Sequence, residues 1–234
     1  PNRADLDRLK QVSGLGSSMV TLAPEVVPDG FIKELADAGI IVSVGHSNAS
    51  YDCIQDALGN GVSGFTHLFN AMSPLTSREP GVVGAALYDP NSWCGVIVDG
   101  FHVHPSTLNI AIAAKRKGKI MLVSDAVHTV GAKGKNFDLA GRPVYRENGK
   151  VTTIEGTLAG SDLDMASAVR NTVQMLDINL EEALRMASLY PAQFLSLDHK
   201  LGRIDTNYQA DFVLLDNNLE VVETWINGEA SGSL

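Results

Sequence analysis

Short apolar runs rich in β-branched residues recur along the first half of the chain, and most of them end in a polar residue. The polar residues that close four of these runs are His46, His67, Asp99 and Asp125. A fifth run occupies residues 18–22. Runs of this length and composition are typical of strands that are buried on both faces of a parallel sheet. The pattern therefore predicts five parallel strands, four of which carry a chemically useful side chain at the carboxyl end.

Helical segments separate the predicted strands. Capping residues and glycines predict helices over residues 30–38 and 105–115, and a third that starts at a cap within residues 48–50 and ends at Leu58. Strand ends recur about every 20–30 residues, which indicates βαβ units. The predicted class is α/β, as a (β/α)8 barrel, in which the chemistry lies where the carboxyl ends of the strands meet.

Five strands are too few to close an eight-stranded barrel. The chain begins at Pro1 rather than at Met, and residues 6–12 have the pattern of a helix that is already under way. We therefore expect the chain to be the later portion of a longer protein. About three strands would then lie upstream of Pro1 or come from another chain.

The pattern changes after Gly131, where short strands surround a strong hairpin signal at Asn148-Gly149. The expected elements are strands over residues 136–138, 143–146 and 150–153, helices over 164–176 and 180–189, and strands over 210–215 and 221–226. We divide the chain into a barrel at residues 1–199, with a β-hairpin insertion near 136–160, and a small C-terminal sheet at residues 200–234.

Composition excludes several classes of function. A net charge of -9 without any Lys/Arg run argues against a nucleic-acid partner. No apolar stretch approaches the roughly 18 residues of a membrane span. The two cysteines, Cys53 and Cys94, are too few for a disulfide framework, so we expect a cytoplasmic protein with a buried thiol at Cys94.

His46 and His67 are candidate metal ligands, because two imidazoles on neighbouring strand ends can bind one ion. The alternative is a pair of hydrogen-bonded structural histidines. Asp125 is a candidate general acid and base, or else the cap of a following helix. His102 is a candidate for polarising a substrate carbonyl or binding a sugar hydroxyl.

Three further segments are candidates for binding an anion. Arg78, in the loop at residues 77–81, suits bidentate capture of a phosphate or carboxylate, or else it is a surface residue paired with Glu79. Residues 70–72 and 158–161 can supply backbone N–H donors, and Asn70 a side-chain amide.

Several of these motifs, taken in order, resemble those of the N-acetylglucosamine-6-phosphate deacetylases of the amidohydrolase superfamily. The resemblance covers nearly the whole chain. The matching segments are residues 21–25 (TLAPE), 45–49 (GHSNA), 66–72 (THLFNAM), 78–81 (REPG), 99–103 (DGFHV), 124–126 (SDA), 156–161 (GTLAGS), 187–192 (ASLYPA) and 226–228 (ING).

The resemblance implies a (β/α)8 barrel with a small β-sandwich, of which residues 200–234 would be the C-terminal piece. It implies hydrolysis of the acetamide of N-acetyl-D-glucosamine 6-phosphate to D-glucosamine 6-phosphate and acetate. In this family the matching positions make His46 and His67 metal ligands, Asp125 the general acid and base, and His102 a contact of the substrate near the reacting carbonyl. The substrate-binding positions are Asn70, Ala71, Arg78, Leu158, Ala159 and Gly160.

The family resemblance also implies partners. The cofactor would be a divalent metal cation, with zinc the first expectation. Arg78 would reach the phosphate in the neighbouring subunit, which implies a homodimer. The family's third metal ligand is a Glu in a His-Leu-Glu-Gly-Pro type motif, which this chain lacks. We expect that ligand upstream, and Glu25, which lies in a different motif, is not assigned as its replacement.

Two alternatives remain open at this point. The chain could belong to a different amidohydrolase that acts on another N-acyl sugar or on a cyclic amide. It could also be a truncated module that binds a sugar phosphate without hydrolysing it, and the missing carboxylate is the main support for that alternative.

Overall fold

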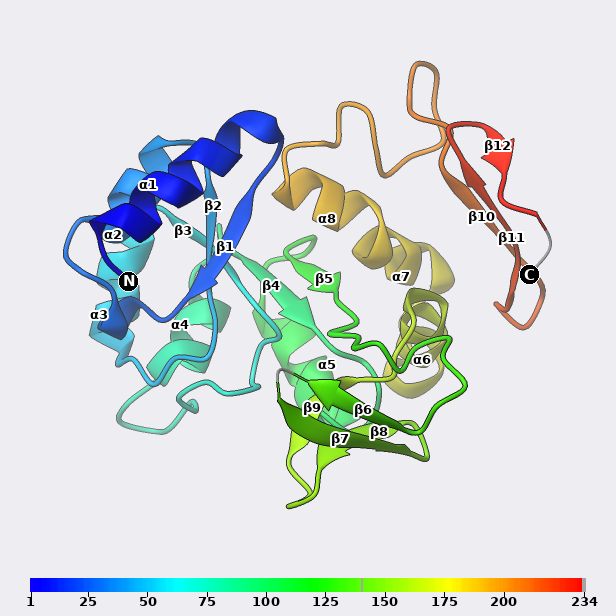
Figure 1. Ribbon diagram of the computed structural model, residues 1–234, viewed down its shortest axis with the longest axis horizontal. Coiled ribbons are helices and arrows are strands. Elements are labelled where there is room, and N and C mark those ends of the chain that lie inside the picture. The colour runs from blue at the N-terminus through cyan, green and yellow to red at the C-terminus, as the bar shows by residue number, and fades with distance from the viewer. Residues whose placement is uncertain (140, 233–234) are drawn as a thin grey trace.

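A five-stranded parallel sheet forms the centre of the computed structural model, which describes residues 1–139 and 141–232 (Figure 1). Its strands lie side by side in chain order, and every neighbouring pair is parallel. The strands are β1 (Met19–Leu22), β2 (Ile41–Val44), β3 (Val62–Phe65), β4 (Trp93–Val96) and β5 (Ile120–Leu122). All five predicted strands and the α/β class are confirmed.

Helices precede the first strand and connect the following ones, as the alternation of signals predicted. They are α1 (Arg3–Val12), the 3-10 helices η1 (Ser13–Leu15) and η2 (Pro24–Val26), α2 (Phe31–Asp37), α3 (Tyr51–Gly59), α4 (Gly81–Tyr88) and α5 (Pro105–Ala114). The Ser50 side chain caps α3 by accepting a hydrogen bond from the backbone N–H of Cys53. The sequence did not predict α4, because residues 81–86 are all buried and the helix has no polar stripe to reveal its period.

Three helices that follow later in the chain pack beside β5: α6 (Met165–Leu176), α7 (Leu180–Ala187) and α8 (Leu189–Phe194). The ring of Phe194 lies 6.0 Å from that of Trp93 between centroids. A Cβ atom on Gly64 would come within 2.5 Å of the Phe194 ring, so β3 needs a glycine where α8 approaches it. The sequence predicted α6 and α7, but not α8 as a separate helix.

The segment between β5 and α6 forms a second, antiparallel sheet (Figure 1). Its strands are β6 (Asn136–Leu139), β7 (Arg142–Glu147), β8 (Lys150–Thr153) and β9 (Leu158–Ser161). The predicted hairpin turn at Asn148-Gly149 is present, and both residues have positive φ, as a type I′ turn requires. β9 was not predicted as a strand.

A third sheet follows α8 and contains β10 (Phe212–Leu215), β11 (Val221–Ile226) and β12 (Glu229–Ala230). Residues of the parallel strands and of the helices that pack against them form the core. The core includes Cys94, where burial raises the pKa of the thiol to about 12. Both cysteines are free thiols. No helix in the described part of the chain is long and apolar enough to span a bilayer.

Candidate active site

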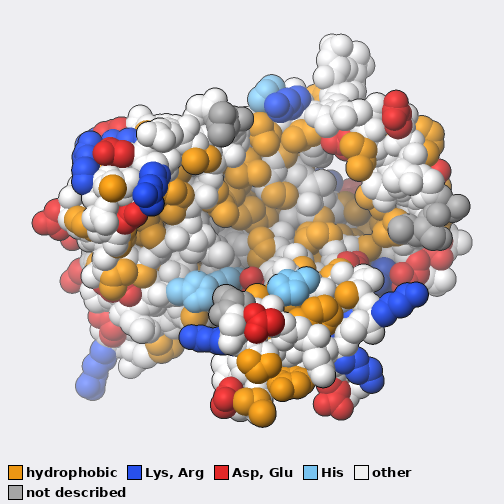
Figure 2. Space-filling view, viewed as in Figure 1, with side chains coloured by type: hydrophobic (Ala, Val, Ile, Leu, Met, Phe, Trp, Pro, Cys, Tyr) orange, Lys and Arg blue, Asp and Glu red, His pale blue; other side chains and the backbone are white. Residues whose placement is uncertain are grey.

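The carboxyl ends of β2, β3 and β5 place three of the predicted site residues in strained backbone. His46 and His67 each lie two residues beyond their strand, and Asp125 lies three residues beyond β5. Their φ angles are 52°, 36° and 52°. Left-handed backbone in residues other than glycine costs of the order of 1–3 kcal/mol and is concentrated at functional sites. Figure 2 shows histidine side chains along the rim of a hollowed face whose centre is lined by hydrophobic side chains.

His46 and His67 point their Nε2 atoms at one another across 3.0 Å, with ring planes at 82°. Imidazole nitrogens that ligate one zinc ion at about 2.0–2.1 Å and a tetrahedral angle are separated by about 3.3 Å. The observed separation suits two ligands of a shared divalent cation, and it equally suits the alternative of a hydrogen bond between the two rings. No group of three or more His, Cys, Asp or Glu side chains within residues 1–139 and 141–232 is placed to hold a metal.

His67 is the buried member of the pair, with 6% of its surface exposed. Burial lowers the pKa of His67, and the nearby His46 and His102 lower it further. The carboxylate of Asp125 raises this pKa, but the net shift is downward. A lowered pKa favours the neutral form of His67, which is the form of histidine that binds a metal ion. His46, His102 and Asp125, which follow β2, β4 and β5, thus lie close enough to His67, which follows β3, to influence its pKa.

Asp125 is held through its main chain by β9. Its carbonyl accepts a hydrogen bond of 2.8 Å from the N–H of Ser161, and the Ser161 carbonyl accepts one of 3.1 Å from Val127. The Ser161 hydroxyl also donates to the carbonyl of Ser124. No helix follows Asp125 directly, so its alternative interpretation as a helix cap is wrong. Asp125 is exposed.

The segment at residues 158–160 therefore belongs to the strand that supports the Asp125 turn, a structural role that the sequence did not indicate. Gly160 has a φ of 75°, and a Cβ atom there would lie 2.5 Å from Val127 Cγ1 and 3.1 Å from the carbonyl oxygen of Asp125. Only glycine lets β9 approach the Asp125 turn this closely. Leu158 and Ala159 lie in the same strand, next to the turn that carries Asp125.

The loop after β4 brings Asp99 and His102 together. His102 Nδ1 lies 2.6 Å from Asp99 Oδ2, and both side chains are almost fully buried. The other carboxylate oxygen accepts hydrogen bonds from the backbone N–H groups of Phe101 and His102. Burial raises the pKa of Asp99, but the hydrogen bonds from His102 and Phe101 lower it more, so Asp99 stays ionised.

Arg78 is exposed on a loop that Glu79 fastens in place. Glu79 Oε1 accepts hydrogen bonds from the N–H groups of Tyr51 and Gly81, which begin α3 and α4. Glu79 is therefore committed to the backbone, and no ion pair in the described part of the chain involves Arg78. The alternative interpretation of Arg78, as a surface residue paired with Glu79, therefore has no ion pair to support it among the described residues.

Asn70 and Ala71 form the turn beyond His67. The Asn70 side-chain amide donates to the carbonyls of His67 and Leu68, so it closes this turn. The Ala71 carbonyl accepts a hydrogen bond from the N–H of Ser47. These bonds tie the turn after β3 to the loop after β2, where His46 lies.

Glu25 has a positioning role that sequence reasoning missed. Its carboxylate accepts hydrogen bonds of 2.7 Å from the Ser47 hydroxyl and from the N–H of Asn48. Glu25 thus holds the segment that follows His46. The remaining histidines lie outside the convergent group: His104 caps α5, His128 contacts the Asp138 carbonyl, and His199 is exposed.

Comparison with known proteins agrees with this geometry. The model of the amidohydrolase family matches residues 14–230. The chain belongs to the amidohydrolase family. The resemblance found in the sequence is thereby confirmed.

Three similar proteins illustrate how this amidohydrolase chain compares with its relatives. It is 46% identical to the N-acetylgalactosamine-6-phosphate deacetylase of Shewanella sp. (strain ANA-3), over 92% of this chain and 54% of the relative. It is 38% identical to the N-acetylglucosamine-6-phosphate deacetylase of Haemophilus influenzae, over 90% of this chain and 55% of the relative. The crystal structure of the N-acetylglucosamine-6-phosphate deacetylase of Pasteurella multocida superposes with a TM-score of 0.95 at 37% identity, covering all of this chain and 61% of that one. The chain thus spans between half and two thirds of the length of these relatives.

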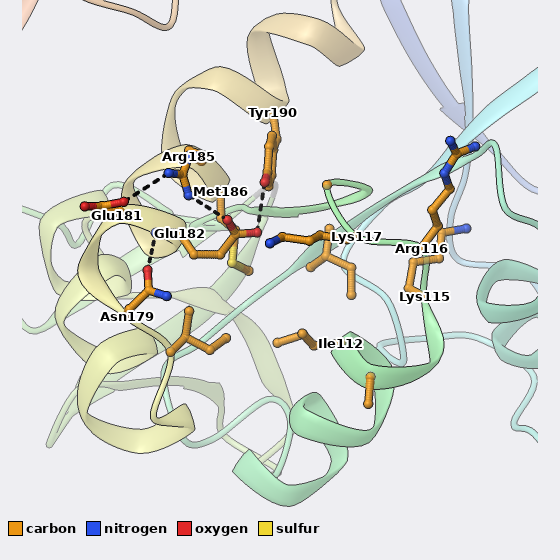
Figure 3. Close-up of a pocket in the computed structure, with 14 residues that line it drawn as sticks. Ile112, Lys115, Arg116, Lys117, Asn179, Glu181, Glu182, Arg185, Met186 and Tyr190 are labelled. Atoms are coloured by element: carbon orange, nitrogen blue, oxygen red, sulfur yellow. Dashed lines mark hydrogen bonds and ion pairs between the residues drawn. The ribbon is translucent and has the colours of Figure 1, made fainter.

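A cavity of the amidohydrolase chain, with a volume of about 660 Å³, lies away from these residues. It is bounded by the end of α5, the start of β5, α7 and α8, at the amino edge of the sheet (Figure 3). Glu182 on its wall accepts hydrogen bonds from Arg185 and Tyr190. The cavity contains none of the convergent histidines, so it is not the candidate active site.

Proposed function

We propose that the chain carries catalytic residues for hydrolysis of the acetamide of N-acetyl-D-glucosamine 6-phosphate, which yields D-glucosamine 6-phosphate and acetate. The observation that carries this proposal is the convergence of the His46–His67 pair with Asp125 and His102 at the carboxyl edge of the sheet. The names of the relatives supply the substrate class, since those compared above are named deacetylases of 6-phosphorylated amino sugars.

His46 and His67 would hold a divalent cation, for which zinc is the expectation, together with a Glu from a segment upstream of this chain. Such an ion supplies Lewis acidity toward water and toward the developing oxyanion. Asp125 would accept the proton of the attacking water and later deliver it to the departing amine. His102 would donate a hydrogen bond near the reacting carbonyl and help to stabilise the tetrahedral oxyanion.

The substrate-binding groups surround these residues. Arg78 would bind the 6-phosphate of a neighbouring subunit in a homodimer, because its guanidinium is exposed and Glu79 is committed elsewhere. Asn70, Ala71, Leu158, Ala159 and Gly160 would line the sugar, since they flank His67 and Asp125. We place the reaction in amino-sugar catabolism in the cytoplasm.

A second substrate, N-acetyl-D-galactosamine 6-phosphate, is favoured by one observation. The Shewanella relative, at 46% identity, is named for that sugar. The two sugars differ only in the configuration at C4, which is remote from the acetamide, so the same catalytic residues would serve both.

The test is acetate release with added zinc from both phosphorylated sugars and from unphosphorylated N-acetylglucosamine. It is run on the 234-residue chain and on a form extended at its N-terminus by the segment of a relative that this chain does not match. We expect release from a phosphorylated sugar, at least in the extended form. Equal rates with and without the 6-phosphate would contradict the role of Arg78. Tight binding of the sugar phosphate without release in either form would favour a non-catalytic module.

A further inference from the structure

Asp99 is the one buried carboxylate that directly contacts a proposed substrate-binding side chain in the described part of the chain. Its Oδ2 lies 2.6 Å from His102 Nδ1, and the side chains of His102 and Asp99 are 5% and 6% exposed. An ionised carboxylate can only accept hydrogen bonds, so the proton between them belongs to Nδ1 of the ring. The opposite nitrogen, Nε2, is left to face away from Asp99.

The loop that holds this pair is tightly constrained. Asp99 Oδ1 accepts hydrogen bonds of 2.8 Å and 2.9 Å from the N–H groups of Phe101 and His102. Asn171 from α6 donates to the carbonyl of Val98, directly before Asp99. Lys150 at the β7–β8 hairpin lies 5.2 Å from the centroid of the Phe101 ring. The two oxygens of Asp99 thus have separate tasks: Oδ1 shapes the turn and Oδ2 contacts the histidine ring.

We propose that Asp99 is a positioning residue for the deacetylation, which holds the proton of His102 on Nδ1 and thereby directs Nε2 toward the substrate. The proposal rests on the proposed function, which puts His102 beside the reacting carbonyl. A carboxylate at Nδ1 also stabilises the positively charged ring, in which Nε2–H donates to a substrate oxygen. Asp99 itself does not touch the substrate.

The division of tasks between the two oxygens allows a variant that separates positioning from folding. In Asp99→Asn, the side-chain carbonyl can keep both backbone hydrogen bonds of the turn, because Asn serves this kind of turn as well as Asp does. The amide NH₂ then replaces Oδ2 and donates to His102 Nδ1. This reverses the tautomer, so the proton moves to Nε2 and the charged ring loses its stabilising carboxylate.

The first measurement is ¹⁵N NMR of the histidine-labelled 234-residue chain without substrate, with His102 assigned from the spectrum of a His102→Gln variant. We expect a protonated Nδ1 in the unsubstituted protein and an unprotonated Nδ1 with a protonated Nε2 in Asp99→Asn. The matched control is Asp216→Asn, since Asp216 Oδ1 also accepts two backbone N–H bonds, from Asn218 and Glu220, in the turn between β10 and β11. An unprotonated Nδ1 in the unsubstituted protein would overturn the proposal, even if the variant did not fold.

The second measurement is acetate release in the form of the protein that shows it. We expect Asp99→Asn to lower kcat by about 10- to 100-fold, as when the hydrogen-bond partner of a functional histidine is removed, with a smaller change in KM. Asp216→Asn should leave both constants unchanged. A folded Asp99→Asn with the reversed tautomer and normal kcat would overturn the role in catalysis. Absence of acetate release in every form would refute the proposed function instead, while the NMR result would still decide whether Asp99 holds the proton.

Discussion

At the carboxyl edge of the parallel sheet, His46 and Asp125 are exposed and occupy left-handed backbone, whereas at the amino edge Lys115 is buried with every donor used. The Lys115 ammonium donates to the carbonyls of Ala86 and Asp89 and to the Ser92 hydroxyl. Burial lowers the pKa of Lys115, yet these acceptors keep the group in place. The carboxyl edge therefore keeps polar side chains accessible, at the cost of strained backbone. At the amino edge, the buried ammonium of Lys115 links the end of α5 to α4 and to the segment that leads into β4.

The cavity lined by α5, α7 and α8 adds a second difference between the two edges of the sheet. This cavity lies at the amino edge, where Arg185 and Glu182 pair with one another. The reactive residues lie at the opposite edge, where the sheet and the β6–β9 sheet meet. In barrels of this kind the carboxyl edge carries chemistry and the amino edge carries stability. Substitutions at the two edges should therefore affect different quantities.

The largest effect is expected from Asp125→Asn at the carboxyl edge. Asn tolerates left-handed backbone, so the fold is kept, but it cannot accept or deliver a proton. We expect acetate release to fall by about 10²–10⁴-fold, with a change in the free energy of unfolding within about 0.5 kcal/mol. Asp177→Asn is the matched control, because Asp177 is exposed with a φ of 54°. Near-normal turnover in Asp125→Asn would refute the assignment of the acid and base.

At the amino edge, Lys115→Met should do the reverse. It removes the donor for three acceptors and leaves buried carbonyls without a partner, so we expect a loss of about 2–4 kcal/mol in the free energy of unfolding. Activity per folded molecule should not change. Chemical denaturation measures the loss, and Lys117→Met, at an exposed neighbouring position, is the control. A loss of activity without a loss of stability would break the contrast between the two edges.

Gly160→Ala tests whether β9 positions Asp125. The added Cβ would meet Val127 Cγ1 at 2.5 Å, and alanine is strained at a φ of 75°. Gly39→Ala is the matched control, since Gly39 has a φ of 77° with no atom within 4 Å of the added Cβ. Both variants should lose about 1 kcal/mol of stability from the backbone, but only Gly160→Ala should reduce turnover. Equal turnover in the two variants would show that Asp125 does not depend on β9.

The smallest effect concerns pH. Because the folded protein disfavours protonation of His67, the unfolded chain binds more protons, and stability rises with pH in that range. The contribution is complete above the ordinary histidine pKa near 6.5 and is lost as the pH falls below it. Thermal unfolding in EDTA between pH 5 and 8 should show this slope, and His67→Gln should reduce it. His199→Gln, at an exposed histidine, should not.

The elements of the fold were largely predictable because their signals are local. Short apolar runs identify β1 to β5, and the capping residues and glycines between them identify α2, α3 and α5. The Asn148-Gly149 turn identifies the β7–β8 hairpin. The exceptions have a physical reason. α4 is buried on all sides and shows no stripe, and β9 pairs with β8 across a register shift that leaves no clear alternation.

Some residues of the candidate site could likewise be predicted from the sequence, and others could not. His46, His67 and Asp125 could be named from the sequence, because each follows a strand and parallel strands end on one edge. Their supports could not, because Glu25 reaches Ser47 and Ser161 reaches Ser124 through contacts between segments more than 20 residues apart. Such contacts depend on how strands and loops pack, and no local pattern records them.

The sequence by itself determined the order of strands and helices, the residues at the strand ends and the resemblance to the deacetylases, because these depend on side-chain periodicity and residue type. Only the tertiary structure decided that two imidazole nitrogens lie 3.0 Å apart, that Asp99 holds His102, and that Glu79 is bound to the backbone rather than to Arg78. Distances between side chains are set by packing across the sheet, where a shift of 1 Å changes the chemistry without changing any residue.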